Sequence, residues 1–193
     1  MSISNSSRRP VRGAVSIIEA VPFQTSAKRL EKAALLEYAV RALERRALTE
    51  FELRTRLRRR AANQDDVDPT IDRLREIGYI DDERTAESYA RSRKEFSSLG
   101  SRRVLNDLRR RGVEASTAER IVDESYEGAD ELELIRAHLR RRLGRRREER
   151  LQDPKETAKL FRALQRAGFH SDKIGEVLRR IGAAPEWLDG TDE

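Results

Sequence analysis

The sequence predicts an all-α protein, folded as an elongated, curved stack of three tandem three-helix repeats. Three observations predict this fold. Apolar residues recur at helical spacing along most of the 193-residue chain. Charged residues make up 39% of the chain and apolar residues 37%, which is too polar for one thick core. A leucine–arginine pattern also returns at a period of roughly 50 residues, which is typical of helical repeat proteins.

The first repeat is predicted over residues 31–80. Six apolar residues of its first helix fall on one stripe: Leu35, Leu36, Tyr38, Ala39, Ala42 and Leu43. Thr49 and Glu52 have the spacing of a capping box, in which each side chain bonds a free backbone amide, so a second helix starts there. Its apolar residues are Phe51, Leu53 and Leu57. Pro69 is expected where the third helix begins, and Gly78 where it ends. The stripe of that helix is Ile71, Leu74 and Ile77.

The second repeat is predicted over residues 81–128. Asp81 and Asp82 are interpreted as helix caps, because a carboxylate at a helix start accepts free amides and complements the helix dipole. With Glu83 they could instead form a metal or acid–base site, but no second group that such chemistry needs is visible nearby. The middle helix ends at Gly112, and Ser116 caps the third. The apolar residues of the three helices are Ala86, Tyr89, Ala90 and Phe96, then Val104, Leu105 and Leu108, then Ala118, Ile121, Val122 and Tyr126.

The third repeat is predicted over residues 129–183. Its first stripe is Leu132, Ile135, Leu139 and Leu143. Pro154 opens the middle helix and Gly168 closes it, and Ser171 caps the last helix. The remaining apolar residues are Leu160, Phe161, Leu164 and Ala167, then Ile174, Val177, Leu178 and Ile181.

The two ends of the chain are expected outside the repeats. Residues 1–30 are predicted as a flexible N-terminal tail, and residues 184–193 as an acidic C-terminal tail. We find no signal peptide and no apolar run of the roughly 20 residues that span a bilayer, so we expect a cytoplasmic protein without membrane contact.

The residue inventory argues against catalysis. The chain has no cysteine, which excludes disulfides, thiolate nucleophiles and cysteine zinc sites. The two histidines, His138 and His170, have no ligand spacing to another histidine or acid and are interpreted as ordinary surface residues. There is no phosphate-binding loop with its lysine and no nucleophile elbow. We therefore expect neither a catalytic residue nor a metal or other cofactor.

Arginine is the residue type that points to function. The net charge is +6, and residues 136–150 alone, with eight arginines and two glutamates, carry that much. If the repeats stack in register, the arginine clusters form a broken basic stripe able to contact DNA phosphates or acidic protein surfaces. The candidate contact residues are Arg54, Arg58, Arg59, Arg60, Arg102, Arg103, Arg109, Arg110, Arg111, Arg140, Arg141, Arg142, Arg145 and Arg146. Arginines near helix ends also favour the helix dipole, so a purely solvated role stays open for each of them.

Three segments resemble the RecX family of RecA regulators. They are LREIGYIDDERTAESYA at residues 74–90, LGSRRVLNDLRRRGV at residues 99–113 and TEFELRTRL at residues 49–57. The resemblance covers about residues 33–182, and Thr85 stands where family members usually carry Phe. It implies three tandem three-helix repeats, no cofactor, and docking into the helical groove of the RecA filament on single-stranded DNA. It also implies inhibition of RecA's recombinase, ATPase and coprotease activities.

Two other functions are compatible with the residues. One is a stand-alone helical nucleic-acid-binding protein that uses the basic segment Arg136–Arg150, with weak binding to single-stranded or duplex DNA. The other is an interaction scaffold without a DNA role. In each case we expect a monomer.

Overall fold

The apolar stripes form helices in three groups of three. The computed structural model describes residues 29–144 and 153–182, and within these ranges it holds nine α-helices and no strand. The first group is α1 (Lys32–Arg45), α2 (Glu50–Arg58) and α3 (Val67–Glu76), with a short 3-10 turn, η1 (Gln64–Asp66), before α3. The second is α4 (Asp82–Ser97), α5 (Ser101–Arg110) and α6 (Ala115–Tyr126). The third is α7 (Glu131–Leu143), α9 (Pro154–Arg166) and α10 (Ser171–Arg180). The predicted all-α fold is confirmed.

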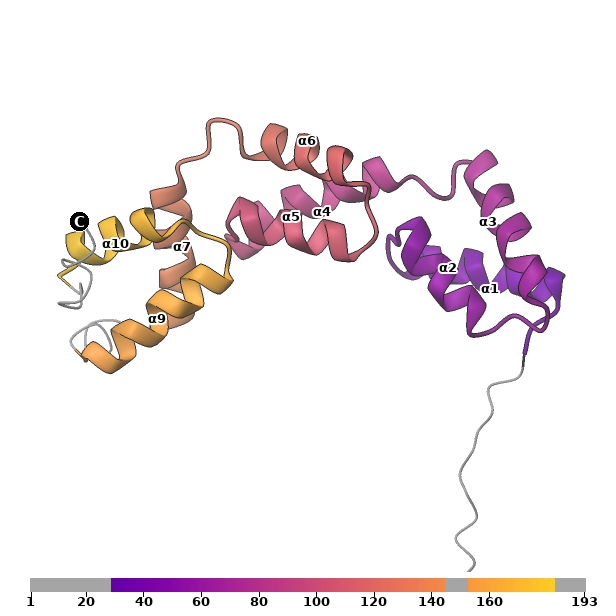
Figure 1. The fold of residues 1–193 in the computed structure, drawn as a ribbon, viewed down its shortest axis with the longest axis horizontal. Coiled ribbons are helices and arrows are strands. Elements are labelled where there is room, and N and C mark those ends of the chain that lie inside the picture. Colours follow the sequence, from indigo (N-terminus) through magenta and orange to yellow (C-terminus); the bar gives the residue numbers. More distant parts are fainter. Residues whose placement is uncertain (1–28, 145–152, 183–193) are drawn as a thin grey trace, which may run out of the picture.

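The three groups lie one after another along a single arc. Figure 1 shows an elongated, curved molecule in which the middle helices α2, α5 and α9 line the lower, concave side. Each group has its own apolar core, and the three cores include the fully buried Leu53, Leu108 and Leu164 respectively. Three thin cores replace one thick core, which is how so polar a chain buries enough apolar surface to fold.

Three residues of the predicted stripes are not in these cores. Phe51 is 54% exposed, Ile77 44% and Phe96 72%. Ile77 follows the last turn of α3, and Phe96 lies beyond Ala90, the last buried residue of α4. Side chains at the ends of these helices therefore project past the layer that the neighbouring helices cover. Helical spacing continues to the end of a helix, whereas burial stops where the packed neighbour stops.

The repeats meet at two joints of the same design. At each joint the start of one middle helix meets the end of the next. At the first joint, the Thr49 hydroxyl donates to the Arg111 carbonyl at 2.5 Å. At the second, the Gly100 N–H donates to the Ala167 carbonyl at 2.9 Å. Arg111 and Ala167 occupy equivalent positions, three residues after the buried leucines Leu108 and Leu164 of their helices.

Glycines allow the close approach at both joints. A Cβ on Gly112 would lie 2.3 Å from the Phe51 Cβ, and one on Gly168 would lie 2.3 Å from the Arg103 backbone nitrogen. Both glycines have positive φ, at 83° and 92°, which a residue with a side chain adopts only with strain. Gly100 has an ordinary φ, but its own Cβ would lie 2.3 Å from the Gly168 carbonyl oxygen. The contacts at the two joints therefore fix the position of each repeat relative to the preceding one.

Candidate functional site

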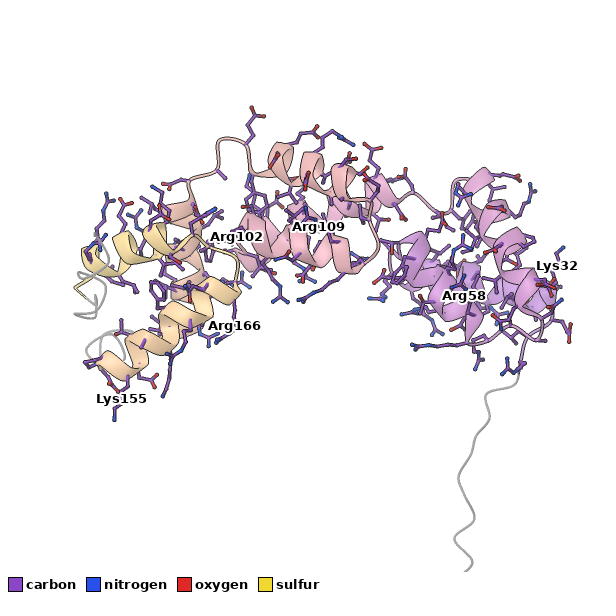
Figure 2. All side chains as sticks on the ribbon, viewed as in Figure 1. Lys32, Arg58, Arg102, Arg109, Lys155 and Arg166 are labelled. Carbon is purple, nitrogen blue, oxygen red and sulfur yellow. The ribbon has the colours of Figure 1, made fainter. Side chains whose placement is uncertain are left out.

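Most of the predicted contact arginines belong to, or directly follow, the middle helices α2 and α5, which line the concave side. Figure 2 shows Arg58 on α2 and Arg102 and Arg109 on α5. Arg140, Arg141 and Arg142 lie instead at the end of α7, the first helix of the third repeat. Arg145 and Arg146 lie outside the described residues.

Five of the predicted residues are paired with carboxylates: Arg54, Arg103, Arg109, Arg111 and Arg140. Arg103 contacts Asp107 at 2.9 Å from Nε to Oδ2, and Arg140 contacts Glu133 at 2.7 Å from Nη2 to Oε1. Arg109 pairs with Glu119. Arg54 pairs with Asp68 and, at 2.8 Å from Nη2 to Oε1, with Glu50. Exposed ion pairs contribute only about 0–1 kcal/mol, so Arg103, Arg109 and Arg140 are partly neutralised but not locked in place. Arg54 is half-buried and bound by two acids, so it is held more firmly.

Arg111 is a structural residue of the first joint. Its guanidinium makes a two-point contact with Glu52, with Nη2–Oε2 at 2.9 Å and Nε–Oε1 at 3.2 Å, and lies 4.8 Å from the Tyr89 ring centroid. The side chain is only 16% exposed. Burial alone would raise the pKa of Glu52, but hydrogen bonds from Arg111 and the Thr49 N–H outweigh it and lower that pKa. The prediction of Arg111 as a free contact residue is therefore corrected, because its charge is already neutralised.

Arg60 is also committed to packing. Its guanidinium carbon lies 5.3 Å above the Tyr38 ring, in cation–π geometry. Its Nε is buried and has no hydrogen-bond partner within the described structure. Arg60 and Arg111 occupy equivalent positions just after α2 and α5, three residues after Leu57 and Leu108. This position points toward neighbouring side chains in both repeats.

The position one residue earlier is different. Arg59, Arg110 and Arg166 each come two residues after the last buried leucine of a middle helix, and each is exposed. None of the three forms an ion pair with another residue in the described part of the chain. The same exposure and lack of a described ion pair are found for four other predicted residues: Arg58, Arg102, Arg141 and Arg142. Arg166 was absent from the predicted set, although the segment Leu164-Gln-Arg-Ala-Gly repeats the pattern that holds Arg59 and Arg110.

The acids at the start of α4 act as caps on two different helices. Asp81 is the N-cap of α4, and its Oδ1 accepts the Arg84 N–H at 2.9 Å. Asp82 was predicted to cap the same helix but instead accepts the Glu50 N–H at 2.7 Å, at the start of α2. Burial raises the pKa of Asp82, while the bond from Glu50 opposes that rise. Asp82 thus connects two repeats, which local spacing does not reveal.

Two predicted serine caps are wrong. Glu114 is the N-cap of α6 and accepts the Thr117 N–H at 2.9 Å, because its longer side chain reaches the free amides from before the helix. Ser116 donates to the same carboxylate, and these bonds lower the pKa of Glu114 to about 2. Ser171 is the first residue of α10 rather than its cap, and its hydroxyl accepts from Gln165 at 3.1 Å.

The histidines are structural. His138 was interpreted as a surface residue, but it is half-buried at the second joint. There its Nδ1 lies 3.1 Å from the Ser98 carbonyl oxygen, and its ring meets Phe169 edge-on. Burial lowers the pKa of His138. His170 is exposed and contacts Glu131 at 3.1 Å.

Neither a candidate metal-ion cluster nor a membrane-spanning helix is found in residues 29–144 and 153–182. No three histidine, cysteine, aspartate or glutamate side chains there are grouped to hold a metal ion. No helix in the same ranges combines the length and apolar character that crossing a bilayer requires.

The chain is similar to known proteins over most of its described length. It matches family profiles described as the first, second and third three-helix domains of RecX, at residues 36–74, 81–120 and 129–178. The regulatory protein RecX of Chromobacterium violaceum is 32% identical over 118 residues, which cover 61% of this chain and 71% of that protein. The regulatory protein RecX of Halorhodospira halophila is 36% identical over 121 residues, covering 62% and 70% respectively.

Solved structures share the fold. The crystal structure of RecX from Lactobacillus salivarius matches with a TM-score of 0.61 and 20% identity, over 78% of this chain and 96% of that one. A second crystal structure, of a regulatory protein RecX, matches with a TM-score of 0.57 and 22% identity, over 77% and 73%. At these identities the likeness concerns the fold alone.

Proposed function

This chain belongs to the RecX family of regulatory proteins, and from that premise we propose that it binds RecA and its filament on single-stranded DNA. Bound there, it inhibits RecA's recombinase, ATPase and coprotease activities. It acts by binding, as a monomer in the cytoplasm, without a cofactor and without a reaction of its own.

The observation that supports this proposal is a set of three equivalent arginines at the C-terminal ends of α2, α5 and α9, the helices that line the concave side. Arg59, Arg110 and Arg166 are exposed and free of ion pairs with described residues, and they recur once per repeat along the arc. A guanidinium pairs with phosphate or carboxylate through two parallel hydrogen bonds. Three such groups along a curved surface suit a long, negatively charged groove better than a single small ligand.

A triple substitution tests the role of these arginines. We expect the variant Arg59→Ala/Arg110→Ala/Arg166→Ala to inhibit RecA more weakly than wild type, because three charge-assisted contacts are lost. The concentration that halves RecA's ATP hydrolysis on single-stranded DNA should rise roughly tenfold or more. The helical circular-dichroism signal should stay at the wild-type level, since all three side chains are exposed.

The matched control removes three other exposed arginines without described ion pairs, Arg84 and Arg91 on α4 and Arg179 on α10. The triple alanine variant of these residues has the same net charge as the test variant. We expect it to inhibit like wild type. Equal loss of inhibition in both variants would mean that total charge, rather than the concave side, determines binding.

The stand-alone nucleic-acid-binding protein is the second candidate. Arg141 and Arg142 favour it, because they are exposed at the end of α7 and have no ion pair in the described part of the chain. The rest of its basic segment, residues 145–150, lies outside the described residues. This candidate would be favoured if the protein binds DNA but, added in substoichiometric amounts, does not change RecA's ATP hydrolysis. Little salt-sensitive binding to oligonucleotides would favour a scaffold.

A further inference from the structure

A basic groove lies at the joint between the second and third repeats. It encloses about 410 Å³ between the exposed face of α5, the end of α9 and the start of α10. All its charged lining residues are arginines: Arg102, Arg103, Arg110 and Arg166. Asn106, Gln165 and Ser171 supply the polar groups. Figure 2 shows Arg102 and Arg166 on the two sides of this joint.

The frame of the groove is built from backbone contacts. Gly168 packs against the backbone of Arg103, and the Gly100 N–H donates to the Ala167 carbonyl at 2.9 Å. Arg103 is further held by Asp107 at 2.9 Å and lies 3.5 Å from the Arg166 carbonyl oxygen. Arg102, Arg110 and Arg166 have no ion pair with any described residue. The groove therefore combines a fixed frame with three guanidinium groups that are available to a ligand.

At the first joint, the groove beside the corresponding glycine, Gly112, has the opposite charge. This acidic groove encloses about 450 Å³ and is lined by one cation, Arg54, and by four acids: Glu50, Asp82, Glu83 and Glu114. Another groove at the first joint is lined by Arg46, Arg93 and Arg111 with Glu52. The basic groove and the acidic groove are both formed where the glycine at the end of one middle helix meets the start of the preceding one. The lining of the basic groove is therefore not a consequence of the repeat fold, since the same geometry carries acids one repeat earlier.

We propose that the basic groove binds consecutive phosphates of a single-stranded DNA backbone. This inference rests on the proposed function and names the ligand of one part of its surface. A phosphodiester chain presents a negative charge on every nucleotide, so a short stretch can meet several guanidinium groups at once. An acidic protein surface would have to place several carboxylates within the same small volume. Phe169 is buried beneath the groove, so binding involves the backbone rather than base stacking.

Direct binding to DNA without RecA tests this proposal. The probe is a fluorescein-labelled oligothymidylate, and fluorescence anisotropy is followed across a salt series. We expect Arg102→Ala/Arg166→Ala to weaken binding roughly tenfold or more at low salt. The slope of log affinity against log salt should become smaller by about 1.4, from about 0.7 per lost phosphate contact on a single strand. The control pair Arg84→Ala/Arg91→Ala should keep the wild-type affinity and slope.

Each other outcome has a defined meaning. Equal losses in the test and control pairs, or no loss in either, would overturn the groove as a DNA site. Unchanged oligonucleotide binding by Arg102→Ala/Arg166→Ala with lost inhibition of RecA would assign the groove to an acidic protein surface instead. Wild-type protein that binds DNA through the groove but leaves RecA unaffected would contradict the proposed function and leave the groove proposal standing.

Discussion

Arg110 and Arg111 are adjacent in sequence, yet their guanidinium groups lie in different environments. Successive residues on an α-helix point about 100° apart, so a run of arginines at the end of a helix spreads over several faces. Arg110 lines the basic groove, while Arg111 contacts Glu52 across the first joint and the Tyr89 ring within its own repeat. Within such a run, one position is free to bind a ligand and the next holds two repeats together.

This difference predicts unequal effects on stability. Arg111→Ala should lower the free energy of unfolding by about 1–3 kcal/mol, because it removes charged hydrogen bonds and leaves Glu52 without its main partner at a half-buried site. Arg110→Ala should change it by less than about 0.5 kcal/mol. Urea unfolding followed by circular dichroism measures both. Equal effects of the two substitutions would contradict a structural role for Arg111.

His138 predicts a pH-dependent stability. Burial lowers its pKa in the folded protein, so below the unfolded value of about 6.5 the unfolded chain binds more protons than the folded one. The contribution of His138 to stability is thus present above pH 6.5 and declines as the pH falls toward the folded pKa. Urea unfolding at pH 7 and pH 5 should show a smaller pH effect for His138→Asn than for wild type. An unchanged pH effect would place His138 outside this linkage.

Local spacing predicts single residues only where their partners are local. The capping box of Thr49 and Glu52 and the cap formed by Asp81 involve neighbours within three residues, and the sequence pattern indicates them. Glu52 also bonds Arg111, 59 residues away, and no periodicity reports such a contact. The same limit applies to Arg109, whose acid partner Glu119 lies on another helix, whereas Arg103 pairs with Asp107 one turn away on its own helix.

At the scale of the helix, the sequence predicts most of the fold. Each middle helix has a buried apolar residue near its centre, namely Leu53, Val104 or Leu160, and a buried leucine near its end, as the stripes indicate. Pro154 opens α9 as expected. Helix α3 begins at Val67, so Pro69 lies in its first turn, where a missing N–H has no cost. What the stripes do not predict is the extent of burial at helix ends, which is set by the length of the neighbouring helix.

Leu108 tests the core of the second repeat. Its side chain is fully buried, so Leu108→Ala should lower the free energy of unfolding by about 2–5 kcal/mol through lost burial and the cavity left behind. Phe96→Ala removes a larger side chain that is 72% exposed, and should change stability by less than about 0.5 kcal/mol. Chemical unfolding of the two variants compares them directly. A larger loss for Phe96→Ala would contradict the helix packing.

At the scale of the whole molecule, shape depends on the two joints. The hydrogen bonds from Thr49 to Arg111 and from Gly100 to Ala167 are equivalent in position but differ in chemistry, one from a hydroxyl and one from a backbone N–H. The repeat pattern in the sequence predicts that three units stack. The direction in which each unit follows the last depends on these contacts, and the sequence pattern does not contain that information.

Gly100 tests the second joint. Gly100→Ala adds a methyl group where the Gly168 carbonyl oxygen lies 2.3 Å away, so the third repeat must move. We expect a changed maximum dimension in small-angle X-ray scattering and weaker inhibition of RecA. Gly128→Ala is the control, because its Cβ meets nothing within 4 Å and its cost is backbone strain from a φ of 66°. An identical scattering curve for Gly100→Ala and wild type would show that the joint yields without changing the shape.

The position of Gly100 has a consequence for the reach of the molecule. This glycine precedes α5 in the second repeat and contacts the inner end of the third repeat at the Ala167 carbonyl. The third repeat extends beyond that contact as one arm of the arc. A small rotation of the third repeat about this contact displaces its far end by a much larger distance, because the displacement grows with distance from the axis of rotation. A single atom added at this pivot could therefore misalign every basic group farther along the arm while leaving each of them chemically intact.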